Sequence, residues 1–102
     1  MKIYIITATY CLNTNGCEIE FEEFIDMFTE YFDADAWFAH EFESVRNSVA
    51  VSGAKYATLK LCAVPLVGNV LKKQDASVLR TVHIWFRKYI TYIAKKNKRL
   101  TI

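Results

Sequence analysis

Residues 2–21 read KIYIITATYCLNTNGCEIEF, and this stretch sets the beginning of the fold. Its first half is rich in Ile, Tyr and Thr, whose β-branched and aromatic side chains suit a pleated, half-buried surface. Asn15 and Gly16 supply the two positive-φ positions of a tight hairpin turn. Apolar and acidic residues alternate after the turn, which places three side chains on one face: Cys17, Ile19 and Phe21. The stretch therefore predicts a β-hairpin.

The apolar period then changes, and residues 21–33 fit an amphipathic helix. The apolar side chains recur at helical spacing in one arc: Phe21, Phe24, Ile25, Phe28, Tyr31 and Phe32. The acidic side chains fall on the opposite arc: Glu22, Glu23, Asp26, Glu30 and Asp33. Early acids also complement the positive end of a helix dipole. We therefore predict an acidic helix over about residues 21–33.

The middle of the chain gives a weaker signal. Residues 35–46 allow a short helix capped by Asp35, but the alternation of Phe38, His40 and Phe42 also fits a strand. Residues 47–73 have the character of extended structure, punctuated by Gly53 and Gly68. Within them residues 55–64 alternate, with four apolar side chains on one side: Ala57, Leu59, Leu61 and Ala63.

Residues 76–97 give the strongest helical pattern, with Asp75 or Ser77 as the cap. Seven apolar residues cover one arc: Val78, Val82, Trp85, Phe86, Tyr89, Tyr92 and Ile93. Five basic residues lie on the other side: Arg80, Arg87, Lys88, Lys95 and Lys98. This pattern predicts a long amphipathic C-terminal helix with a basic outer face.

A chain of 102 residues, 53% apolar and 15% aromatic, has enough apolar surface for one folded domain, here residues 1–102. This composition excludes a disordered or low-complexity chain. We expect the α+β class, with a small antiparallel sheet covered on one face by the two helices. The alternative is a mostly α fold, if residues 36–64 are helical.

The charges are strongly segregated along the chain. Residues 1–50 hold ten acidic residues and two basic ones, a net charge of −8. Residues 51–102 hold eleven basic residues and one acidic one, a net charge of +10. Exposed ion pairs contribute only about 0–1 kcal/mol each, so stability alone does not require this segregation. Two separate outer faces of opposite sign would steer charged partners.

Motifs of catalysis and metal binding are absent from the sequence. It has no glycine-rich phosphate loop, no C-x-x-C and no H-E-x-x-H. The odd set of Cys11, Cys17 and Cys62 is typical of reduced thiols, and hairpin geometry does not favour a Cys11–Cys17 disulfide. We expect no cofactor and no metal. His40 beside Glu41 or Glu43 is the one arrangement that an enzyme hypothesis can use, and spacing does not support it beyond proximity.

We therefore predict a non-enzymatic protein-binding module, an inhibitor or adaptor that docks an acidic-aromatic surface on a basic patch of a larger protein. Phage or plasmid proteins that block a host nuclease or a CRISPR-type complex have this profile, which is an analogy of profile and not of sequence. The surface comprises seven residues: Glu22, Glu23, Asp26, Glu30, Asp33, Asp35 and Trp37.

The alternative partner is nucleic acid, because basic side chains release counterions from phosphates. The contact set comprises seven residues: Arg80, Arg87, Lys88, Lys95, Lys96, Lys98 and Arg99. A homodimer is also compatible with the pattern. No stretch reaches the roughly 20 apolar residues of a membrane span. The N-terminus does not fit a signal peptide, so we take Met1 as the start of the domain and expect a cytoplasmic protein without membrane contact.

Overall fold

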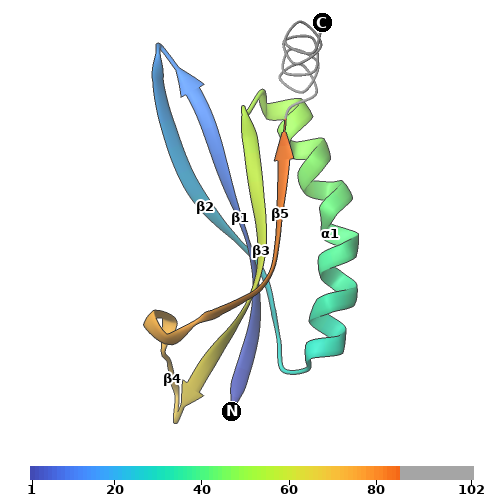
Figure 1. Cartoon of the computed structure of the whole chain (residues 1–102), viewed down its shortest axis with the longest axis vertical. Helices are drawn as coiled ribbons and strands as arrows, with labels where there is room; N and C mark the ends of the chain where they lie inside the picture. The colour runs from blue at the N-terminus through green and yellow to red at the C-terminus, as the bar shows by residue number, and fades with distance from the viewer. Residues whose placement is uncertain (86–102) are drawn as a thin grey trace, which may run out of the picture.

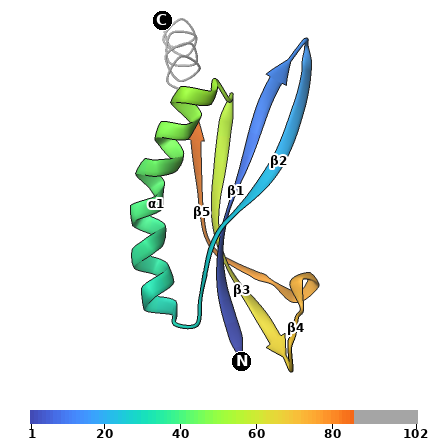
Figure 2. The ribbon, with the colours of Figure 1, turned by 180° about the vertical axis from the view of Figure 1, so that it is seen from behind.

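The computed structural model describes residues 1–85. They form a small, curled antiparallel sheet of five strands with one long helix packed on one face, an α+β arrangement (Figures 1 and 2). The strands lie in the order β2-β1-β3-β5, and the short β4 pairs with the last two residues of β3, Leu66 and Val67. The elements are β1 (Lys2–Thr14), β2 (Cys17–Phe28), α1 (Tyr31–Ser52), β3 (Tyr56–Val67), β4 (Val70–Leu71), a 3₁₀ turn (Lys73–Asp75) and β5 (Ser77–Trp85).

The predicted hairpin is confirmed. β1 and β2 pair in antiparallel register, and Thr14 lies opposite Cys17 across a two-residue loop. Asn15 has φ 54° and Gly16 has φ 81°, so both loop residues are in the left-handed region that a type I′ turn requires. The right-handed twist of such a turn matches that of the strands it joins.

Alternation along β1 and β3 divides the side chains between the two faces of the sheet. Ile6, Ala8 and Tyr10 lie in one buried cluster with residues of α1. The predicted apolar side of β3 is confirmed, since Ala57, Leu59 and Leu61 are fully buried in the same cluster. The opposite face holds a smaller buried group, made of Ile3, Ile5 and Val64.

Helix α1 resolves the ambiguity at residues 35–46 in favour of a helix. Ala34, Phe38, Val45 and Val49 recur at helical spacing and are buried against the sheet. The helix ends at Gly53, whose φ of 71° lets its N–H donate to the Val49 carbonyl oxygen. The predicted capping role of Asp35 is wrong, because α1 begins four residues earlier, after Glu30 at the N-cap position.

The acidic helix predicted at residues 21–33 is wrong: residues 17–28 are strand β2, and α1 begins only at Tyr31. The register with β1 shifts between Ile6 and Thr7, which leaves Ile25 as an extra residue in β2. This bulge moves the alternation by one position, so the apolar residues Phe21, Ile25 and Phe28 acquire a spacing that resembles a helix.

The helix predicted at residues 76–97 is wrong in its first part, because Ser77–Trp85 is strand β5 paired with β3. The remainder, from Phe86 on, lies outside the described residues. Neither predicted cap holds, since Asp75 ends a 3₁₀ turn and Ser77 begins a strand. In residues 1–85 one helix covers the sheet, not two, and the mostly α alternative is also wrong.

The extended structure predicted for residues 47–73 is confirmed in part. Residues 47–52 belong to α1, whereas residues 56–67 and 70–71 are strands. None of the helical segments in residues 1–85 combines the length and apolar character needed to cross a bilayer.

Candidate partner-binding surface

The most distinctive feature of the molecule is the outer edge of β2. Among residues 1–85, β2 pairs only with β1. The backbone of Cys11 faces β3, since its carbonyl oxygen accepts a hydrogen bond of 2.8 Å from the Lys55 N–H. Glu20 lies opposite Cys11 on β2, so its own N–H and C=O point away from β1. The same alternation turns outward the main-chain groups of Glu18 and Glu22.

The acidic and apolar side chains of this edge lie on opposite faces of the sheet. Glu18, Glu20 and Glu22 lie opposite Asn13, Cys11 and Thr9, on the face away from α1. The other face presents Ile19 and Phe21, whose exposed fractions are 52% and 47%. The segment Glu18–Glu23 therefore carries an acidic row on one face and an apolar pair on the other. We call this segment the β2 edge.

Two of the glutamates contact the first residue of β3 and the residue before it. The Glu18 carboxylate accepts a hydrogen bond of 2.7 Å from the Lys55 ammonium, and the Glu20 carboxylate accepts one of 2.7 Å from the Tyr56 phenol. The Tyr56 ring in turn lies 5.1 Å from the Trp85 ring. The hydrogen bond to Glu20 is the main cause that raises the pKa of Tyr56 well above its ordinary value.

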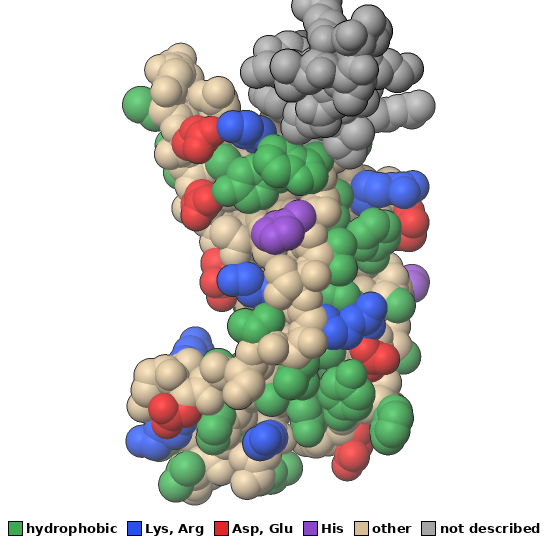
Figure 3. Space-filling model, viewed as in Figure 1, with side chains coloured by type: hydrophobic (Ala, Val, Ile, Leu, Met, Phe, Trp, Pro, Cys, Tyr) green, Lys and Arg blue, Asp and Glu red, His purple; other side chains and the backbone are tan. Residues whose placement is uncertain are grey.

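These contacts place acids and aromatic rings on one surface. Figure 3 shows acidic side chains along the margin formed by the β1–β2 hairpin, beside a hydrophobic patch on the same face. On either side of the bulge at Ile25, β2 also leaves Phe24 and Met27 about half exposed, at 55% and 49%. This surface can hold a cation by charge and by an aromatic face, and it can accept an apolar group.

The predicted acidic-aromatic set is divided between the two faces of β2 and the beginning of α1. Glu22 lies on the face away from α1, whereas its neighbour Glu23 lies opposite Ala8, which packs against the helix. Asp26 lies opposite Ile6, Glu30 precedes α1 and Asp33 lies in its first turn. Trp37 is on α1, 41% exposed, with its ring 4.8 Å from that of His40.

Asp35 and Arg80 come from the two oppositely charged predicted sets and bind each other. Arg80 Nη1 lies 2.6 Å from Asp35 Oδ1, and the guanidinium carbon lies 4.4 Å from the centre of the Phe38 ring. With the Lys55–Glu18 pair, two ion pairs join the acidic and basic halves within the described residues. The other basic residues of the predicted nucleic-acid contact lie outside the described residues: Arg87, Lys88, Lys95, Lys96, Lys98 and Arg99.

The remaining candidate residues each contact a different partner. His40 is exposed beside Trp37, and Glu43 forms an ion pair of 3.1 Å with Arg46. His83 Nδ1 lies 3.0 Å from the Thr58 hydroxyl on the face away from α1. Residues 1–85 contain no cluster of three or more His, Cys, Asp or Glu side chains that would hold a metal ion.

All three cysteines lie in the described part of the chain and are free thiols. Cys11 is buried and Cys17 is exposed. They are not opposite each other in the hairpin, since Cys11 faces Glu20 and Cys17 faces Thr14. This arrangement confirms that the hairpin does not favour a disulfide between them.

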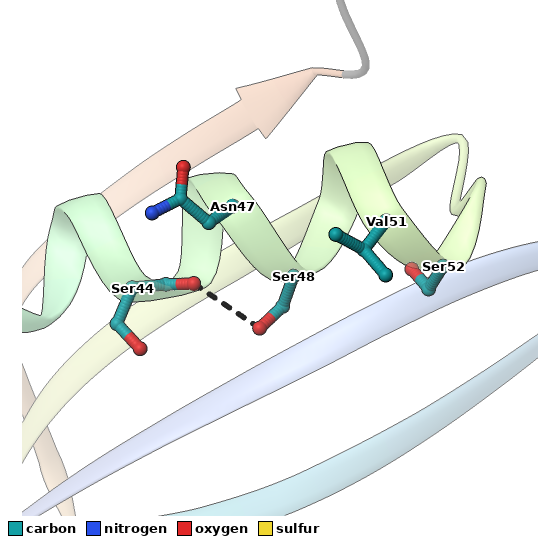
Figure 4. Close-up of a pocket in the computed structure, with 5 residues that line it drawn as sticks. All are labelled: Ser44, Asn47, Ser48, Val51 and Ser52. Carbon is teal, nitrogen blue, oxygen red and sulfur yellow. Dashed lines mark hydrogen bonds between the residues drawn. The ribbon is translucent and has the colours of Figure 1, made fainter.

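An open cavity of about 480 Å³ lies along the last turns of α1. Figure 4 shows the five lining residues, all on α1: Ser44, Asn47, Ser48, Val51 and Ser52. The Ser48 hydroxyl already donates a hydrogen bond of 3.1 Å to the Ser44 carbonyl oxygen. None of the lining residues is titratable, so they supply no general acid or base.

The predicted set of seven surface residues does not include Glu18, Glu20, Tyr56 or Trp85. A signal for the glutamates was present, since the alternation of residues 17–21 predicts Glu18 and Glu20 on one face. Tyr56 and Trp85 are brought to them by the pairing of β3 with β1 and β5, which local patterns do not contain.

No family model matches the chain, and no curated protein or solved structure is significantly similar to it.

Proposed function

We propose that the protein is a non-enzymatic binding module, an inhibitor or adaptor, and that its β2 edge docks on a basic surface of a larger protein. The observation that carries the proposal is the composition of β2. Its twelve residues, CEIEFEEFIDMF, hold five acids and no base, and they form an edge strand within residues 1–85.

Edge strands of this length are usually protected against association. Charged side chains (lysine above all), proline, a bulge, a short strand or a covering loop serve this purpose in other proteins, and in β2 the charges are all acidic. β2 contains neither Lys nor Pro and exposes about half of Ile19, Phe21 and Phe24, at 52%, 47% and 55%. Its acids oppose acidic or phosphate-bearing partners and favour basic ones. These features support a surface that is selective for positive charge.

Proteins that handle nucleic acid carry basic grooves, because such grooves neutralise phosphates. An acidic strand edge with exposed aromatic side chains suits such a groove, where it would compete with the nucleic acid. The partner class that we propose is therefore a nucleic-acid-handling protein, and the chain acts by occupying its basic surface.

The test is affinity capture from host lysate with the double variant Glu20→Lys/Glu22→Lys. The matched control is Glu43→Lys/Asp75→Lys, which changes the net charge equally at exposed sites away from β2. We expect a protein that is retained after nuclease treatment, weakened by salt, lost with the first variant and kept with the control. Equal capture by both variants, or capture abolished by nuclease, contradicts the proposal.

A further inference from the structure

Within residues 1–85, the outer main-chain groups of the β2 edge pair with no other strand, so the edge offers hydrogen bonds as well as charge. The outward N–H and C=O groups belong to Glu18, Glu20 and Glu22, two residues apart, as in the bonding pattern of an antiparallel ladder. Building on the proposed function, we propose that the partner segment binds the β2 edge as an added antiparallel strand, and that this segment alternates basic and apolar residues.

The alternation follows from the two faces of the edge. A partner residue directly opposite a glutamate exchanges two main-chain hydrogen bonds with it and shares its face, away from α1. Lys or Arg suits each of these positions, because a carboxylate accepts several hydrogen bonds; Glu18 accepts one from Lys55 and Glu20 one from Tyr56, which leaves acceptor capacity on both carboxylates. The intervening partner residues lie beside Ile19 and Phe21 and are therefore apolar.

The length of the segment follows from the bulge. The register of β2 shifts next to Ile25, and a bulge bends and twists a strand away from a regular partner. The regular part of the edge therefore ends at Phe24, directly before the bulge. It accommodates a core of three basic residues opposite the glutamates Glu18, Glu20 and Glu22, separated by two apolar residues.

A second copy of β2 is a poor occupant of the same edge. It carries the same five acids and no base, so antiparallel pairing of two β2 strands sets carboxylates against carboxylates. Like charges directly opposite each other destabilise a strand pair. Charge complementarity thus favours a basic segment of another protein.

The experiment uses the full chain and two synthetic peptides of equal composition. One alternates lysine and valine, and the other places the lysines and valines in separate blocks. Binding is measured by titration calorimetry, and exchange of the Glu18, Glu20 and Glu22 amides is followed by NMR. We expect the alternating peptide to bind more tightly and to slow the exchange of these three amides.

The decisive variant is Glu22→Pro, because proline removes one outward N–H and is tolerated on an edge strand. Its control, Glu22→Gln, keeps the N–H and removes the charge. Beyond the effect of Glu22→Gln, we expect Glu22→Pro to weaken binding about fivefold, the effect of one lost hydrogen bond. The NMR spectrum of each variant verifies that the sheet is intact.

The other possible results contradict either the strand addition or the proposed function. If both peptides bind equally and Glu22→Pro behaves as Glu22→Gln does, strand addition is wrong while the acidic surface stands. If neither basic peptide binds, the proposed function fails with it. Sedimentation that shows a dimer sensitive to Glu22→Pro assigns the edge to a second copy instead, which also overturns the inference.

Discussion

The Tyr56 phenol donates a hydrogen bond of 2.7 Å to the Glu20 carboxylate, linking β3 to β2 across the intervening β1. This bond raises the pKa of Tyr56, because loss of its proton would place two negative charges together. We predict that Glu20→Ala moves the pKa of Tyr56 down towards the ordinary value of about 10. The measurement is an alkaline titration followed by the absorbance of phenolate, with Tyr56→Phe identifying the signal.

The same bond makes stability depend on pH in a defined direction. The pKa of Tyr56 is higher in the folded than in the unfolded chain, so its contribution is complete below about pH 10 and is lost as pH rises. The unfolding free energy of the wild type should therefore fall more steeply above pH 10 than that of Tyr56→Phe. Parallel curves for the two proteins contradict this reading. Tyr10, whose pKa is raised by burial, contributes equally to both.

Arg80 joins β5 to α1 by charge and by its guanidinium face. It lies 2.6 Å from Asp35 and 4.4 Å from the centre of the Phe38 ring, and its side chain is 39% exposed. We predict that Arg80→Ala lowers the unfolding free energy by about 1 kcal/mol, the range of a partly exposed ion pair with a cation–π contact. Urea unfolding measures the change. Arg46→Ala, at an exposed pair within α1, should cost only a few tenths of that, about 0.3 kcal/mol.

Two phenylalanines of α1 allow the effect of burial on stability to be measured with the same substitution. Phe38 is 1% exposed in the core, whereas Phe32 is 83% exposed. We predict that Phe38→Ala costs about 3–5 kcal/mol and Phe32→Ala less than about 0.5 kcal/mol. Because the first variant risks complete unfolding, Phe38→Leu, with an expected cost of about 1.5 kcal/mol, gives a second measurement by urea unfolding. Equal costs at the two sites would place Phe38 outside the core.

The hairpin turn gives a prediction that depends on backbone geometry alone. Gly16 has φ 81°, and a Cβ atom placed there meets no atom within 4 Å. Any cost of Gly16→Ala therefore arises from the left-handed backbone, about 1–2 kcal/mol. Thermal unfolding measures it against Asn13→Ala, an exposed neighbour in β1. A neutral Gly16→Ala would show that the turn is not type I′.

The elements that were predicted correctly are those in which the local pattern is regular. Asn15-Gly16 requires positive φ, and residues 55–64 keep strict alternation, so the hairpin and β3 follow from local chemistry. The two segments that were wrongly predicted to be helices each contain a strand with a bulge. The register of β2 shifts near Ile25, and that of β5 shifts between Leu61 and Cys62 of β3, leaving Leu79 extra.

A one-residue bulge joins two alternating runs in opposite phase, and the resulting apolar spacing mimics a helical period. Only pairing with a neighbouring strand reveals the difference, and that pairing is a tertiary property. The candidate surface also depends on strand pairing. Glu22 was predicted on the wrong element, and its grouping with Glu18, Glu20 and Tyr56 depends on the order β2-β1-β3.

The charge segregation of the sequence survives only in part. Asp35 and Glu18 are neutralised by Arg80 and Lys55, so the acidic half is not a single free face. What remains is local: besides Glu18, β2 carries four acids and no base. The proposed function therefore rests on one strand edge and not on the polarity of the whole chain.

The most direct test of this account is the affinity of the alternating lysine–valine peptide for three proteins at two ionic strengths. They are the wild type, Glu20→Lys/Glu22→Lys and the charge-matched Glu43→Lys/Asp75→Lys. We expect the wild type and the matched variant to bind alike, with affinity that falls as salt rises, and the β2 variant not to bind. Equal binding by all three proteins would show that net charge, and not the β2 edge, attracts the partner.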